Sequence, residues 1–229
     1  MSKEDVFIGS LNEGTISTTF IIYDRHARPV GSHQVEFTQF YPEAGWVEHD
    51  PMEILESVKV CMAKALDKAT ANGHNVDSGF KGIGSTTLLW SKSIGSPLYN
   101  AIVWMDARTS SVCWKLEKEL SGHFSAMKLI WLMENVDTVK QAIKSGDAPF
   151  GTIDTRLIWN LTGGVKGGLH VTDLSKLMHL ETLDWDQPSL KSLGIPAEIL
   201  PKIAGIPISG YAAVLGIVVK STPSRSPRR

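Results

Sequence analysis

The sequence predicts one main α/β domain, and two patterns carry this prediction. Residues 6–11, 18–23 and 30–37 are rich in β-branched and aromatic side chains and follow one another closely, which indicates a three-stranded meander at the start of the chain. An amphipathic helix pattern comes next, and strand and helix patterns alternate after it. Strands followed by helices that cross back over the sheet are typical of an α/β fold.

The helix after the meander has the strongest local signals. Asp50 suits the N-cap, Pro51 suits the first helical position, and apolar side chains recur every three or four residues until Gly73. Beyond it, residues 80–90 and 101–104 are expected to form strands. Apolar spacing predicts the remaining helices at residues 109–120, 124–135, 138–144, 155–161 and 186–193, with a strand at residues 150–153.

The composition of the 229 residues is that of a globular protein, with 42% hydrophobic and 21% charged residues. Because 23 Lys and Arg residues nearly balance 24 Asp and Glu residues, we expect no nucleic-acid partner. Cys61 and Cys113 lie far apart and are expected to be buried free thiols in a reducing compartment. The start of the chain lacks the apolar run of a signal peptide, so we expect a cytoplasmic location.

One stretch calls for a membrane test. Residues 203–219 carry no charge, but Pro207 and three glycines interrupt them, and they number fewer than the ~20 apolar residues that span a bilayer. We therefore expect buried loop and strand there, and no membrane partner. The basic Ser/Pro/Arg tail at residues 217–229 is expected to be disordered.

A polar turn joins the first two predicted strands. It runs from Asn12 to Thr19, and a bend at Gly14 flanked by hydroxyl groups can aim backbone and side-chain donors at a phosphate. An ordinary polar hairpin turn is the favoured alternative for so short a pattern. Glu13 also argues against phosphate, because it places a negative charge nearby.

A second group of residues follows the strand at 101–104. Trp104 and Asp106 lie where a strand of an open α/β sheet ends, and an aromatic wall beside a carboxylate can hold a polyol. Equally, Asp106 and Arg108 can cap the next helix while Trp104 fills the core. The histidines and cysteines show no metal-ligand spacing, so no metal site is expected. Neither a G-x-S-x-G elbow nor a P-loop occurs, so the sequence carries no hydrolase or P-loop signature.

Four motifs resemble the amino-terminal half of the glycerol kinases, which belong to the FGGY carbohydrate kinases, with a plant form the most similar. The motifs occupy residues 10–23, 37–51, 101–109 and 124–135, in the family's order. The resemblance extends from about residue 6 to residue 216. It implies a ribonuclease-H-like (actin-like ATPase) domain with a mixed sheet and helices on both faces.

The resemblance also implies a reaction, in which ATP with magnesium phosphorylates glycerol to glycerol 3-phosphate. Family members hold the nucleotide between this domain and a second, carboxy-terminal domain. We expect residues 1–216 to be the N-terminal kinase domain and the nucleotide-binding domain to be absent from this chain. Carried over onto this sequence, a degenerate phosphate hairpin comprises Asn12, Gly14, Thr15, Ser17 and Thr18, and the substrate contacts comprise Trp104 and Asp106.

The departures from the family pattern concentrate in its ligand motifs. The family hairpin reads Asp-Gln-Gly-Thr-Thr-Ser-Thr-Arg, so Asn12 replaces the carboxylate that helps organise magnesium, Ile16 replaces a hydroxyl, and Thr19 replaces an arginine that faces the phosphate. These losses are costly because phosphoryl transfer depends on charge neutralisation. Arg156 stands where the family has a tryptophan.

The substrate motifs are also altered. After Gly84 the family has Asp-Gln-Arg-Glu, whose Arg and Glu hold glycerol, and this chain lacks it. His123 replaces a tyrosine, and residues 210–213 read Gly-Tyr-Ala-Ala where the family carries its Asp base, so no catalytic residue is expected. We expect a chain that is impaired or inactive alone. The alternatives are a non-catalytic pseudo-kinase that binds a partner, such as an intact glycerol kinase in a homo- or hetero-oligomer, and a degraded gene product.

Overall fold

The computed structural model describes residues 7–74, 76, 80–83, 87–103, 105–109, 124–172, 178–179 and 184–203. These residues form two compact units. The first unit holds the described residues up to Glu36 and from Glu56 to Ile83, and the second unit holds residues 37–55 and the described residues from 87 onward. The single domain predicted for residues 1–216 stays a prediction.

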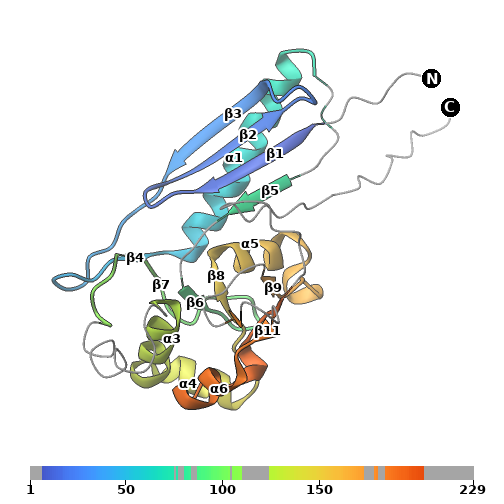
Figure 1. Ribbon diagram of the computed structural model, residues 1–229. Helices are drawn as coiled ribbons and strands as arrows, with labels where there is room; N and C mark the ends of the chain where they lie inside the picture. The colour runs from blue at the N-terminus through green and yellow to red at the C-terminus, as the bar shows by residue number, and fades with distance from the viewer. Residues whose placement is uncertain are drawn as a thin grey trace. The chain divides into compact units, whose positions relative to one another are not determined.

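The first unit contains a four-stranded sheet with the order β3-β2-β1-β5 (Figure 1). Its strands are β1 (Ile8–Glu13), β2 (Ser17–Tyr23), β3 (Pro29–Glu36) and β5 (Phe80–Ile83). The first three pair antiparallel, which confirms the predicted meander, and β5 lies parallel to β1. The carboxyl ends of β1 and β5 therefore meet at one edge of the sheet, where Asn12 is paired with Ile83.

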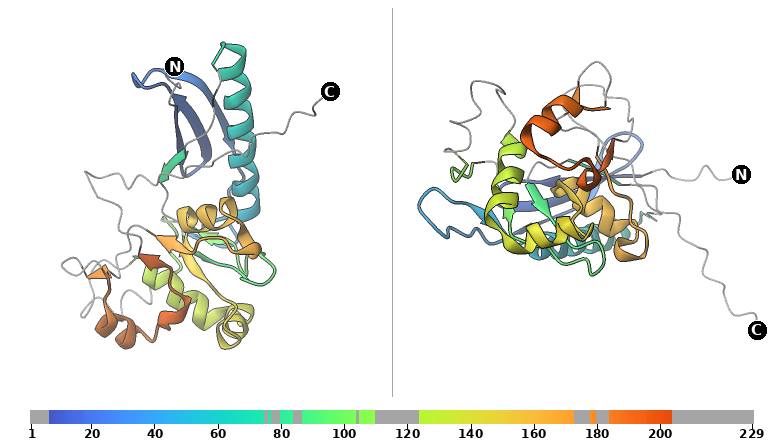
Figure 2. Two further views of the ribbon diagram at one scale, coloured as in Figure 1. Left: turned by 90° about the vertical axis from the view of Figure 1, so that its right-hand side faces the viewer. Right: turned by 90° about the horizontal axis from the view of Figure 1, so that it is seen from below.

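Helix α1 (Pro51–Ala71) confirms the predicted signals at both of its ends. The Met52 N–H donates to Asp50 Oδ1 at 2.8 Å, and Gly73 follows the helix with a φ of +82°. In the first unit the helix lies along one face of the meander (Figure 2). The core between them contains Phe7, Phe20, Ile22, Val30, Cys61, Ala65 and Ala69. Cys61 is a buried free thiol as predicted, whereas Cys113 lies outside the described residues.

The second unit contains an antiparallel sheet with the order β4-β7-β6-β8. Its strands are β4 (Glu48–His49), β6 (Thr87–Leu89), β7 (Ala101–Ile102) and β8 (Phe150–Thr152). Neighbouring side chains on β6 point to opposite faces of this sheet. One face packs on helix α3 (Phe124–Asn135) and the other on helix α5 (Ile153–Leu161), so helices cover both faces of this sheet, as expected.

The packing of β6 shows the two layers directly. Leu89 belongs to a core cluster with Leu129 of α3 (Phe124–Asn135). Leu88 belongs to another cluster with Trp90 and Trp159, the latter from α5 (Ile153–Leu161). The remaining elements are α4 (Asp137–Lys144), η1 (Gly164–Lys166), β9 (Val171–Thr172), β10 (Met178–His179), β11 (Asp184–Trp185), α6 (Gln187–Leu193), η2 (Ala197–Ile199) and β12 (Lys202–Ile203).

One predicted element is wrong, and three predictions fall on residues that the structure does not describe. Residues 80–90 do not form one strand, because β5 pairs in the first unit and β6 pairs in the second. The hydrophobic pattern of the run reports burial and not which sheet each part joins. The predicted helix at 109–120 lies outside the described residues from 110 onward, and so do the stretch from 204 and the tail at 217–229. Among the described helices, none is long and apolar enough to cross a membrane.

The sheet and α1 approach each other tightly at Gly31. A Cβ atom built on Gly31 would lie 2.2 Å from the Ala65 backbone carbonyl oxygen, so the two layers meet with no space for a side chain. We predict that Gly31→Ala lowers the free energy of unfolding by about 2 kcal/mol, the typical cost of overpacking a well-packed core. Urea denaturation measures this change. Ser32→Ala, at an exposed position on the same strand, serves as the control, and an equal effect of both substitutions would contradict the prediction.

Candidate functional site

The predicted phosphate hairpin is a tight turn in the first unit. Glu13 and Thr18 are the last paired residues of β1 and β2, and the Gly14 N–H donates to the Ser17 carbonyl at 2.9 Å. This bond closes the turn over Thr15 and Ile16, and Ile16 is 57% exposed. The Gly14 N–H is therefore used within the turn, where the phosphate hypothesis requires a donor that points outward.

Strand alternation sends neighbouring residues of the hairpin to opposite faces of the sheet. Asn12 is exposed, whereas Glu13 is partly buried on the face that α1 covers, together with Thr18, which is fully buried. The Thr18 hydroxyl donates to Glu13 Oε2 at 2.9 Å and also forms a hydrogen bond with the Ser57 hydroxyl of α1. The Thr18 hydroxyl is thus engaged on the helix side of the sheet.

Burial changes the chemistry of Glu13. It raises the pKa of this carboxyl from its ordinary value of 4.5 to about 8, against a smaller opposite effect of the Thr18 hydrogen bond. Glu13 Oε1 is buried, and no hydrogen-bond partner for it occurs in the described part of the chain. Glu13 is therefore largely protonated at neutral pH, so the objection that it places a negative charge beside a phosphate loses its force.

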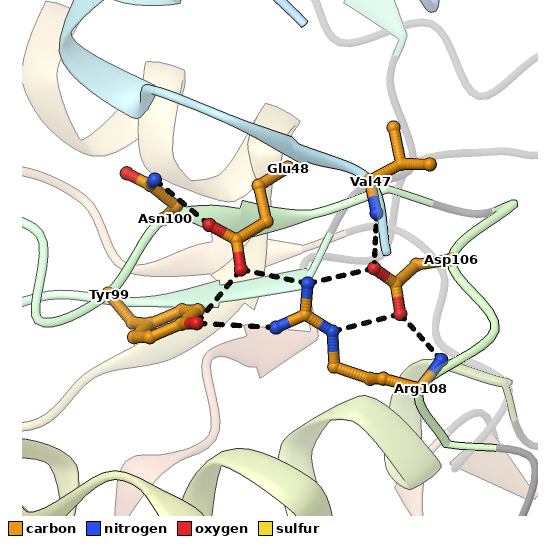
Figure 3. Close-up of polar contacts among 6 residues, drawn as sticks. All are labelled: Val47, Glu48, Tyr99, Asn100, Asp106 and Arg108. Carbon is orange, nitrogen blue, oxygen red and sulfur yellow. Dashed lines mark hydrogen bonds and ion pairs between the residues drawn. The ribbon is translucent and has the colours of Figure 1, made fainter. Parts of the chain in front are cut away.

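The second predicted group of residues lies in the second unit and is centred on a buried arginine (Figure 3). Arg108 donates through Nε and Nη2 to the two carboxylate oxygens of Asp106, at 2.9 and 2.8 Å. The same Nη2 forms an ion pair with Glu48 Oε1 at 2.8 Å. The three ionised side chains are at most 8% exposed, so this network is shielded from solvent.

Two further residues and two rings complete this network. Tyr99 Oη and Asn100 Nδ2 donate to the two oxygens of Glu48, at 2.8 and 3.0 Å. The Arg108 guanidinium lies 3.9 Å from the ring centroid of Trp46 and 4.8 Å from that of Trp131. Burial acts to lower the pKa of Arg108, but the hydrogen bonds to both carboxylates raise it above its ordinary value.

Asp106 is fully occupied by contacts within the chain. Besides the Arg108 side chain, its oxygens accept the backbone N–H groups of Val47 at 2.6 Å and Arg108 at 2.9 Å. A carboxylate has about four acceptor positions, and all four are used here. This arrangement favours a positioning role for Asp106, and direct binding of a polyol by Asp106 stays a prediction. Trp104 lies outside the described residues, but the backbone on either side is held by bonds from Val103 N–H and Ala107 N–H.

The sequence patterns located these segments but missed several of the residues that matter. Glu48 lies in the motif at residues 37–51 but was given no role there, and Tyr99 lies in no motif, because their roles arise from contacts made where β4 pairs with β7. Arg108 was noted only as a helix-capping residue. The hairpin belongs to the first unit and the Arg108 network to the second. Among the described residues, no group of three His, Cys, Asp or Glu side chains is placed to hold a metal ion.

Removing the central cation should destabilise the second unit strongly. Arg108→Met leaves Asp106 and Glu48 buried without their counter-charge, and breaking a buried ion pair costs about 3–5 kcal/mol. We expect a loss of this size in the free energy of unfolding from urea denaturation. Lys140→Met, which breaks the exposed pair with Asp137, is the matched control and should cost about 0.5 kcal/mol or less. Equal losses of unfolding free energy in the two variants would show that the Arg108 network does not stabilise the fold beyond an exposed ion pair.

Glu13 should make stability depend on pH. The folded state keeps its proton up to about pH 8, whereas the unfolded state releases it near pH 4.5, so the free energy of unfolding falls as pH rises between these values. We expect Glu13→Gln to remove this slope and to stabilise the chain at pH 8 by roughly 4 kcal/mol relative to wild type. Denaturation from pH 5 to 9 measures it. The exposed Glu36→Gln is the control, and identical pH profiles for Glu13→Gln and wild type would refute the prediction.

Comparisons with known proteins identify the same family as the four sequence motifs. The model of the FGGY family of carbohydrate kinases, N-terminal domain, matches residues 7–208. A glycerol kinase of Arabidopsis thaliana is 65% identical over 97% of this chain, and one of Mycobacterium tuberculosis is 40% identical over 94%. This chain covers 47% and 46% of those two proteins, so it spans about half the length of the relatives it matches.

Solved structures give the same result. The crystal structure of Plasmodium falciparum glycerol kinase with ADP matches 86% of this chain with a TM-score of 0.77 at 30% identity, and the match covers 42% of that protein. A xylulose kinase from Lactobacillus acidophilus matches with a TM-score of 0.69 at 23% identity, which supports the fold alone. The predicted actin-like fold is confirmed. The chain belongs to the FGGY family of carbohydrate kinases, whose N-terminal domain it carries.

Proposed function

We propose that this chain is a glycerol kinase-like protein that, by itself, does not transfer phosphate from ATP to glycerol. The observation that carries the proposal is the state of the hairpin. Asn12 is neutral, and Glu13, the neighbouring carboxyl, is partly buried against α1 and bonded to Thr18. The hairpin therefore offers no ionised carboxylate to a metal at neutral pH.

Magnesium and ATP are the cofactors that the family implies, and the described residues of the hairpin do not fit them. Mg²⁺ is bound through carboxylates and phosphate oxygens, and an amide such as that of Asn12 is a weaker, neutral ligand. Thr19 also supplies no positive charge where the family has an arginine. Phosphoryl transfer relies on such charges to neutralise the transferred group, so the loss of both should abolish useful catalysis.

The substrate side gives independent support. Of the two polyol contacts carried over from the family, Asp106 has its acceptor positions filled by Val47 and Arg108. Trp104 lies outside the described residues, and an aromatic wall without a partner that accepts hydrogen bonds packs on a polyol without selecting it. The sequence also lacks the family's Asp base, and general-base catalysis contributes ~10²–10⁴-fold.

A coupled assay with the 229-residue chain, ATP, magnesium and glycerol tests the proposal. We expect formation of glycerol 3-phosphate at the rate of the blank without protein, while the Arabidopsis thaliana glycerol kinase assayed in parallel turns over. A cooperative melting transition, recorded on the same preparation, establishes that the chain is folded during the assay. Turnover above the blank that scales with the concentration of this chain would overturn the proposal.

Association with an intact glycerol kinase remains the alternative role. Co-purification of this chain with the full-length Arabidopsis thaliana enzyme, followed by the same coupled assay on the complex, separates the two roles. A complex with altered turnover would assign a regulatory function to a chain that is itself inactive. The absence of a complex would leave the inactive kinase-like chain as the better description.

A further inference from the structure

Arg156 is a buried cation with no counter-charge in the described part of the chain. It lies in α5 with a side chain that is only 1% exposed. Its Nη2 donates to the Gly95 carbonyl and contacts Met52 Sδ at 3.8 Å. Its Nε and Nη1, which carry three of the five guanidinium N–H donors, are buried and have no hydrogen-bond partner among the described residues.

The surroundings of Arg156 are aromatic. Its guanidinium carbon lies 5.2 Å from the ring centroid of Trp90 and 5.3 Å from that of Trp159. Cation–π attraction of this kind contributes up to about 2 kcal/mol. The two rings do not replace the oxygen acceptors that the guanidinium N–H groups need. Burial alone lowers the pKa of Arg156, to about 10, and no carboxylate opposes this effect.

Two other unpartnered donors belong to neighbouring residues, namely Trp90, whose ring lies near the guanidinium, and Thr155, which precedes Arg156 in α5. Trp90 Nε1 and Thr155 Oγ1 are buried and have no hydrogen-bond partner in the described residues. Together with Nε and Nη1 of Arg156, they make four of the five buried side-chain atoms that lack a partner in the described part of the chain. Buried polar groups in folded proteins are almost always paired, with protein atoms, ordered water or an ion.

We propose that Arg156 is the cationic centre of a binding site for a small oxyanion in the second unit. A phosphate, sulfate or carboxylate group supplies both the missing charge and the missing acceptors, because guanidinium groups bind such oxygens through charge-assisted hydrogen bonds. Trp90, whose ring lies 5.2 Å from the guanidinium carbon, carries a further neutral donor without a partner in the described residues. The proposal does not depend on the proposed function, because no residue of the hairpin or of the Arg108 network takes part.

The guanidinium lies one side chain below the surface. Met52, which touches Nη2, is 46% exposed, and Ile94, beside the carbonyl that accepts from Nη2, is 72% exposed. Methionine has three rotatable side-chain bonds and adapts easily to its surroundings. A change in the Met52 rotamer therefore gives a small anion a short route to Arg156.

Thermal unfolding of the full 229-residue chain tests this site. Sodium phosphate, sodium sulfate and sodium acetate are titrated separately against sodium chloride at constant ionic strength and pH 7.5. We expect at least one oxyanion to raise the Tm by about 5 °C at 100 times its Kd, with the logarithmic dependence on free anion that binding to the folded state requires. The responding salts identify the ligand chemistry, phosphate or sulfate against carboxylate. A chain whose Tm does not respond to any of the three overturns the proposal.

Variants assign the response to this residue. Arg156→Met removes the charge and should melt at a higher temperature than wild type in chloride, with no oxyanion response. Lys92→Met removes an exposed charge from the same unit and should keep the full response. An equal response in Arg156→Met and wild type places the anion elsewhere, the hairpin included, and refutes the proposal.

A second measurement does not depend on the variants folding. Because Trp90 and Trp159 flank the guanidinium, anion binding should change the intrinsic tryptophan fluorescence of the wild-type chain at 25 °C. The anion concentration at half of the maximal change should match the Kd from the thermal series. Arg156→Lys keeps a positive charge but loses the planar set of N–H donors. We expect this variant to need at least ten times more anion for the half-maximal fluorescence change. A fluorescence titration without saturation would contradict a thermal response at this site.

Discussion

An ionisable group that leaves water must find a counter-charge, lose its charge, or bind a ligand, and three side chains of this protein represent these three outcomes. Arg108 is paired with Asp106 and Glu48 and lies against the rings of Trp46 and Trp131. Glu13 is largely neutral, because burial raises its pKa to about 8. Arg156 has no counter-charge among the described residues, and with a pKa of about 10 it stays charged at neutral pH. Its aromatic neighbours resemble those of Arg108, so the difference between the two arginines is the missing carboxylates.

The local elements could be predicted because their signals are themselves local. Asp50, Pro51 and Gly73 mark the ends of α1, and the structure uses each as the sequence indicated. The meander likewise follows from alternating residues and short turns. By contrast, residues 80–90 read as one strand because hydrophobic pattern reports burial and not the pairing partner. Only the tertiary structure shows that the two halves of this run join different sheets.

The site was harder to predict because it depends on contacts between distant residues. A carboxylate after a buried strand suggests a ligand contact, yet Asp106 is used by Val47, which lies 59 residues earlier in the chain. Glu48 is drawn into the same network by the pairing of β4 with β7. The hairpin shows the same limit, since the direction of Glu13 follows from strand alternation but its protonation follows from packing against α1.

Family membership and activity depend on different residues, and the proposed function of this chain rests on that distinction. Apolar faces, turn glycines and the buried network around Arg108 stabilise the fold. This chain matches a solved glycerol kinase with a TM-score of 0.77 at 30% identity. Phosphoryl transfer instead needs a few charged groups at defined positions. Replacing those groups by Asn12 and Thr19 removes charge from the hairpin without touching the core, since Asn12 is exposed and Thr19 pairs with it across the strands. The architecture of a kinase therefore does not by itself establish phosphoryl transfer, which depends on the charges placed at the hairpin.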